Sequence, residues 1–224
     1  MSPAAPSLRS TLPWLFALFV VSGFCGLLYQ IVWLRLAFAS FGVVTPVLSV
    51  LISVFMAGLA LGSWLGGRWI EPRCARTGRP ALFYYGFVEI GIGVGAFAVP
   101  VLFALGERLL LGSGQAGSAS YLFWSALLIT VAVLPWCVFM GTTYPFVTAY
   151  IQQLDRRDES GFSYLYLANV LGAMAGVVLT ALVLVESLGF RATLALAGAA
   201  NFSLGAIAFW LASRHGGAPA ATGP

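Results

Sequence analysis

The sequence contains no lysine, one histidine and few charged residues of either sign. Only 8% of its 224 residues are charged, whereas soluble domains contain about 25%. This scarcity excludes a soluble globular domain and a disordered chain, because both need a polar surface. The three cysteines include no C-x-x-C pair, so neither a disulfide framework nor a zinc motif is indicated.

Several ligand classes are excluded by the same scarcity. The single histidine, His215, leaves no ligand set for haem, chlorin or most transition metals. We therefore expect no cofactor and no metal site. All 11 basic residues are arginine and give a net charge of +4. They stand singly or in short loops between apolar runs, an arrangement that reports membrane topology, so we expect no nucleic-acid partner.

Hydrophobic residues are abundant, at 60% of the chain, and the mean hydropathy is +0.96. The sequence therefore predicts an all-α integral membrane protein with a bilayer as solvent. A single membrane domain is expected over residues 1–213, followed by a flexible Gly- and Pro-containing tail over 214–224. The six predicted spans are 12–34, 43–70, 81–105, 119–151, 161–185 and 192–213.

The arginines orient these spans. With a cytoplasmic N-terminus, three arginines lie outside, namely Arg35, Arg108 and Arg191. Eight lie inside, namely Arg9, Arg68, Arg73, Arg76, Arg79, Arg156, Arg157 and Arg214. The positive-inside rule then favours six crossings with both termini in the cytoplasm. Five or seven crossings would require a different division of the fourth segment, where Pro135 and Pro145 predict a kink or break.

Glycines recur every four residues in two spans, which puts them on one helix face where two backbones can approach closely. They are Gly58, Gly62 and Gly66 in the second span, and Gly172 and Gly176 in the fifth. They indicate packing within the bundle; a dimer interface or a sliding face of a moving transporter is the alternative. The equivalent places of these two spans favour an inverted 3+3 repeat, as in half of a major facilitator transporter.

One acid lies well inside a span. Glu89 is eight residues from the inner end of the third segment, at a depth of roughly 12 Å. Its charge would cost about 2.5–3.5 kcal/mol at the bilayer centre. The residues expected beside it in one polar layer are Tyr166, Asn169, Thr142 and Thr143, whereas Asn201 is expected nearer the midplane. This layer is either a small cavity for a cation or proton, or a protonated Glu89 bonded to Asn169 or a backbone carbonyl.

The first inner loop is rich in arginine. Arg73, Arg76 and Arg79 are expected to meet anionic lipid headgroups. The loop, which contains Glu71, also resembles the signature loop between the second and third spans of major facilitator proteins.

Five stretches in order carry a wider resemblance. They are Ser22-Gly-Phe-Cys-Gly-Leu-Leu-Tyr29-Gln30-Ile-Val-Trp33-Leu-Arg35, Phe55-Met-Ala-Gly58-Leu-Ala-Leu-Gly62-Ser, Val88-Glu89-Ile-Gly91-Ile-Gly93, Met140-Gly141-Thr-Thr-Tyr-Pro145 and Tyr166-Leu-Ala-Asn169-Val-Leu-Gly172-Ala-Met-Ala-Gly176. Together they resemble the membrane region of bacterial spermidine synthase-like membrane proteins. Gln30 stands where members of that family commonly carry an acid. No glycine-rich strand–helix unit of the cytosolic synthase domain occurs in these residues.

The resemblance implies a non-catalytic membrane module in the bacterial inner membrane. Such a module would anchor a cytosolic aminopropyltransferase-like partner or pass substrate to it. One alternative is a polyamine or small-cation transporter acting as a homodimer, because one six-span half lacks the second wall of a central path. Another is a structural accessory subunit of a larger membrane complex.

Overall fold

Helices make up every element that the structure describes. The computed structural model covers residues 8–42, 44–112, 117–155 and 160–214. The elements are α1 (Leu8–Phe41), α2 (Thr45–Thr77), α3 (Ala81–Gly112), α4 (Ser118–Leu154), α5 (Ser160–Leu179), the short π-helix η1 (Thr180–Leu184) and α6 (Val185–Arg214). The predicted all-α class is confirmed. Of the tail expected over 214–224, Arg214 is the last residue of α6, and residues 215–224 lie outside the described residues.

Five helical runs are long and apolar enough to cross a membrane. Four coincide with α1 to α4, and the fifth, Gly161–Arg214, contains α5, η1 and α6. Leu111 is 74% exposed and Leu182 is 70% exposed. Apolar surface of this kind, on helices that are hydrophobic all round, is typical of helices that face lipid. These runs make the chain a candidate membrane protein.

The fourth run differs from the prediction. α4 continues without interruption from Ser118 to Leu154, with Pro135 and Pro145 inside it, so of the kink or break predicted there, the break does not occur. A proline removes one backbone hydrogen bond. In lipid a helix retains its remaining bonds because no water can replace them, and neighbouring helices support the weakened turn.

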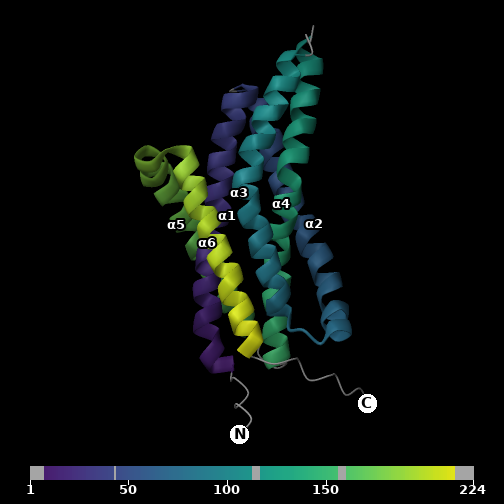
Figure 1. The fold of residues 1–224 in the computed structure, drawn as a ribbon, viewed down its shortest axis with the longest axis vertical. Coiled ribbons are helices and arrows are strands. Elements are labelled where there is room, and N and C mark those ends of the chain that lie inside the picture. The colour runs from purple at the N-terminus through teal and green to yellow at the C-terminus, as the bar shows by residue number, and fades with distance from the viewer. Residues whose placement is uncertain (1–7, 43, 113–116, 156–159, 215–224) are drawn as a thin grey trace.

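The fifth run turns back on itself. Gly189 has φ 72° and ψ 172°, a conformation that is outside the helical region and essentially restricted to glycine. Figure 1 shows α5 and α6 as two neighbouring helices, joined by a turn at the end of the bundle opposite to the C-terminal end of α6. Near this turn, Glu186 forms an ion pair of 3.9 Å with Arg35 of α1, and both side chains are exposed.

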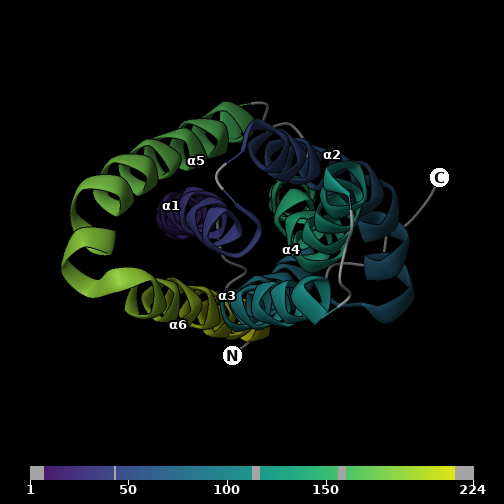
Figure 2. The same ribbon diagram turned by 90° about the horizontal axis from the view of Figure 1, so that it is seen from above.

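The helices form two groups of three. Viewed along the bundle, α1 lies between α5 and α6, and α4 lies between α2 and α3 (Figure 2). Packing of α3 against α6 joins the two groups along one side. On the other side α2 and α5 make no comparable contact.

All five glycines singled out in the sequence lie against a neighbouring helix of this chain. On α2, a Cβ at Gly62 would lie 2.8 Å from Cα of Gly141 on α4. On α5, Gly172 lies against the backbone of Val20 on α1. Gly58 and Gly66 likewise contact α4, and Gly176 contacts α1. Because nothing larger than hydrogen fits at such crossings, these glycines determine how closely the paired helices approach.

Candidate functional site

Glu89 of α3 is completely buried, with 0% of its surface exposed. The Ser22 hydroxyl of α1 donates a hydrogen bond of 2.7 Å to Oε1 of Glu89. The Asn201 amide of α6 donates one of 2.5 Å to Oε2. Both carboxyl oxygens therefore accept a hydrogen bond, each from a different helix.

A third side chain extends this network along α1. The buried Tyr29 hydroxyl donates a hydrogen bond of 2.7 Å to Oδ1 of Asn201. The Tyr29 ring stacks on Trp33, with 5.1 Å between ring centroids. The Asn201 amide is thereby held with its oxygen toward Tyr29 and its nitrogen toward Glu89, which fixes the side chain between α1 and α3.

The network carries no compensating positive charge. Among the described residues, Glu89 forms no ion pair, and the arginine of the one ion pair present, Arg35, is bonded to Glu186 instead. A buried carboxylate ordinarily requires a charged partner or a full set of hydrogen bonds. Glu89 has two polar donors and no base.

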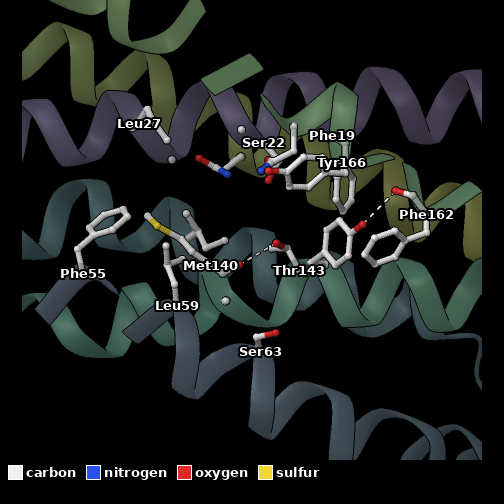
Figure 3. Close-up of a pocket in the computed structure, with 17 residues that line it drawn as sticks. Phe19, Ser22, Leu27, Phe55, Leu59, Ser63, Met140, Thr143, Phe162 and Tyr166 are labelled. Atoms are coloured by element: carbon white, nitrogen blue, oxygen red, sulfur yellow. Dashed lines mark hydrogen bonds between the residues drawn. The ribbon is translucent and has the colours of Figure 1, made fainter. Parts of the chain in front are cut away.

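A cavity of about 400 Å³ lies beside this network (Figure 3). All six of α1 to α6 contribute to its wall. Ser22 and Asn201 line it, so Glu89 lies directly behind two side chains that face the cavity. Figure 3 shows Ser22 and Tyr166 on one side of the space and Ser63 and Thr143 on the other. The polar side chains of the wall are Ser22, Ser63, Thr143, Tyr144, Tyr166, Asn169 and Asn201.

Aromatic rings form one part of this wall. Phe19 and Tyr144 meet edge to face with 6.0 Å between centroids, and Tyr144 meets Phe162 in the same manner at 5.1 Å. The Tyr144 hydroxyl also donates a 3.0 Å hydrogen bond to the Phe162 carbonyl, which ties α4 to α5. Tyr166 is 60% exposed beside them. Ring faces together with amide and hydroxyl oxygens form a surface suited to an organic cation.

The structure brings only part of the predicted polar layer together. Tyr166, Asn169 and Thr143 line the cavity. Thr142 does not line it; this side chain donates to the Phe139 carbonyl of its own helix. Glu89 is hydrogen-bonded to Asn201 and Ser22, and not to Asn169, which was the side-chain partner expected from depth.

Sequence reasoning missed Ser22 and Asn201 as hydrogen-bond partners of Glu89, and Tyr29 as the partner of Asn201. Asn201 was separated from Glu89 because depth was counted from the ends of the predicted spans. The real helices contain 30 or more residues where about 20 suffice, so a count from their ends does not give a common depth. The signal for Asn201 was its amide, the only one in the last span.

Several arginines near the C-terminal end of α6 and at the same end of the bundle pack on aromatic rings. Arg73 lies 4.9 Å from the ring centroid of Trp69, and Arg79 lies 4.3 Å from that of Phe83. Arg76 is exposed between them. Arg68 and Arg214 stack in the same way on Trp64 and Trp210. Such pairs are typical of a membrane interface, where an aromatic body meets a charged tip.

No cluster of three His, Cys, Asp or Glu side chains that could hold a metal occurs in the described part of the chain. Cys25, Cys74 and Cys137 are buried and unpaired as disulfides.

Comparison of the chain with protein-family models, curated proteins and solved structures found no match.

Proposed function

We propose that this chain is a non-catalytic membrane module that binds a small organic cation of the polyamine class in the cavity beside Glu89. The observation that carries the proposal is a fully buried carboxyl that has no basic partner in the described part of the chain and lies one hydrogen bond behind the cavity wall. A bound ammonium group would provide the missing positive charge. Tyr144, Tyr166 and the amides of the wall would contact its alkyl chain and its N–H groups.

Six membrane crossings, with both termini on the cytoplasmic side, are part of this proposal. The fifth apolar run has 54 residues, and a straight helix of that length would be roughly 80 Å long. A bilayer core is only about 30 Å thick. The glycine break at Gly189 and the exposed charges of Glu186 and Arg35 support a turn at an aqueous surface, because charges in mid-membrane are costly.

Matching helix contacts support an inverted repeat, in which α1 to α3 correspond to α4 to α6. Gly62 of α2 faces the Val138 carbonyl of α4, and Gly172 of α5 faces the Val20 carbonyl of α1. The second contact reproduces the first with the two halves exchanged. Val20 corresponds to Val138, and Gly62 corresponds to Gly172.

A second pair of contacts follows the same correspondence. Gly23 of α1 faces the Asn169 carbonyl of α5, and Gly141 of α4 faces the Leu59 carbonyl of α2. The separation in sequence between Gly23 and Gly141 equals that between Val20 and Val138. The separation between Leu59 and Asn169 equals that between Gly62 and Gly172. In both crossings each glycine faces the carbonyl three residues before the opposing glycine, so the α2–α4 and α1–α5 crossings share one geometry.

The third helices of the two halves cross in the same symmetrical way. Gly86 and Gly93 of α3 lie against Gly205 and Gly198 of α6, respectively. Gly86 corresponds to Gly198, and Gly93 to Gly205, each pair being 112 residues apart. Exchanging the halves therefore converts one contact into the other.

The acid and its amide partner have this separation too. Glu89 and Asn201 are 112 residues apart and are hydrogen-bonded to each other. They are equivalent positions of the two halves, which meet near the pseudo-twofold axis. An acid on one half and an amide on the other produce a site with a single negative group, which matches one ammonium group of the cation.

This proposal accommodates the resemblance to spermidine synthase-like membrane proteins. A cytosolic aminopropyltransferase-like partner would receive or supply the polyamine. Arg73, Arg76 and Arg79 would bind anionic lipid headgroups of a bacterial inner membrane. A homodimer that transports the cation, or an accessory subunit of a larger complex, uses the same bundle; measuring the mass of the intact assembly in mild detergent distinguishes these.

The test is binding of putrescine and spermidine to the purified chain in mild detergent, measured by calorimetry. We expect saturable binding by the unmodified protein and at least tenfold weaker binding by Glu89→Gln, which removes the charge and keeps the shape. Glu71→Gln is the matched control, because Glu71 is exposed and lies outside the cavity. Absence of binding, or equal loss in both variants, would refute the proposed cation site.

A further inference from the structure

The surroundings of Glu89 determine whether its carboxyl is ionised or protonated when no cation is bound. The carboxyl is fully buried within an apolar bundle and accepts hydrogen bonds from Ser22 and Asn201. An ionised carboxylate without a positive partner is unfavourable in such a place, whereas a protonated carboxyl is neutral. The Ser22 hydroxyl can either donate to the carboxyl or accept from it, so the network accommodates both states.

The groups around Glu89 do not provide an alternative charge. Among the described residues, the titratable groups that face it are Cys25 and Tyr29 of α1 and Tyr85 of α3, all of which are neutral acids. α6 contributes the amide of Asn201. α2 and α4, which also pack on α3, direct no titratable group at it.

We propose that Glu89 exchanges a proton for the cation: the cavity holds either a proton on Glu89 or an organic cation in front of Ser22 and Asn201. This inference rests on the proposed cation site. In the exchange, the O–H bond of the carboxyl breaks and its proton passes to water, while the ammonium group enters with its own protons intact. One proton leaves the carboxyl and one ammonium group takes its place beside Ser22 and Asn201, so the charge of the carboxylate is balanced in both states. The further ammonium groups of a polyamine bring additional positive charge into the cavity.

Ser22 is the residue that connects the two occupants. Its side chain lines the cavity and also contacts Oε1 of Glu89. An ammonium group at the wall would therefore act on the carboxyl across one hydroxyl. Asn201 has the same position with respect to Oε2. Thus the proton and the cation need not contact each other to exclude each other.

Proton counting tests the exchange on the unmodified protein. Putrescine is titrated into the purified chain by calorimetry, in buffers of different ionisation enthalpy at one pH, which yields protons released per bound cation. We expect close to one proton at pH values where the empty site is protonated. The Kd should then fall about tenfold for each unit by which the pH rises, as linkage requires for a one-proton exchange. Glu89→Gln should release none, and Glu71→Gln should behave like the unmodified protein.

Each outcome distinguishes the two proposals. Saturable binding without proton release, and with a Kd independent of pH, would overturn the exchange and leave the cation site standing. Proton release that persists in Glu89→Gln would overturn the assignment to Glu89. Failure of putrescine and spermidine to bind the folded, unmodified protein would overturn the cation site itself.

Discussion

At the residue scale, the Asn201 side chain joins three helices. It donates to Glu89 of α3 and accepts from Tyr29 of α1, and it is 1% exposed. The isolated acid in an apolar span was evident from the sequence, because charge is so costly there. Its partners were not evident, because hydrogen bonds between helices depend on relative rotation and depth, and neither is encoded in the pattern of any one span.

Replacement of Asn201 by leucine should destabilise the bundle. Asn201→Leu leaves a buried carboxyl and a buried hydroxyl each short of one partner, and such groups cost about 1–3 kcal/mol. We expect a lower apparent melting temperature in detergent, measured by tyrosine and tryptophan fluorescence during heating. Ser203→Ala, two residues on and exposed, is the control and should melt like the unmodified protein. Equal melting of both variants would contradict a stabilising role for this amide.

At the element scale, glycine spacing predicted which faces of the second and fifth spans pack closely. The sequence could not specify the helices opposite them, because any close neighbour satisfies the same spacing. The structure pairs α2 with α4 and α5 with α1. The prolines left a kink and a break both open, and α4 passes through them without a break.

Replacement by alanine should change the stability of the protein in opposite directions at two glycines of α2. A Cβ at Gly62 would meet the Val138 carbonyl and lie 2.8 Å from Cα of Gly141, whereas at Gly67 the nearest atom, Cβ of Pro145, is 4.0 Å away. Gly62→Ala should therefore destabilise the protein by about 1–3 kcal/mol through overpacking. Gly67→Ala should be neutral or stabilising by up to about 1 kcal/mol, because alanine favours helix.

Thermal unfolding in one detergent compares the two variants directly. A melting temperature lowered for Gly62→Ala alone supports the α2–α4 crossing. A similar decrease for Gly67→Ala would mean that helix flexibility, and not the crossing, requires the glycines.

At the scale of the whole molecule, composition was sufficient to predict an all-helical chain with helices long and apolar enough to cross a membrane, because so few of its side chains are polar. The helical run from 161 to 214 shows why the number of crossings is harder to derive. Its hydropathy is almost continuous, and its turn depends on one glycine conformation at Gly189. The contact between Glu89 and Asn201 emerged only from the structure, since nothing in the pattern of either span links an acid to an amide 112 residues away.

The proposed six crossings predict where residue 188 lies. Leu188 is 49% exposed and directly precedes the break at Gly189, near the middle of the 54-residue run. With two crossings in this run, a cysteine at 188 lies at the aqueous surface opposite the termini. With one crossing it would lie within the bilayer. In intact cells that express the Leu188→Cys variant, a membrane-impermeant maleimide should therefore label the protein without permeabilisation.

Ala75→Cys provides the matched comparison, because residue 75 is exposed near the end of α2, beside the arginines expected on the cytoplasmic side. It should be labelled only after permeabilisation. The three native cysteines are buried and should contribute little background. Lack of labelling at 188 under both conditions would indicate a single crossing, and labelling at 188 only after permeabilisation would reverse the orientation. Labelling at 188 from outside and at 75 only from inside requires the chain to cross the membrane between these positions an odd number of times, as three crossings by α3, α4 and α5 do.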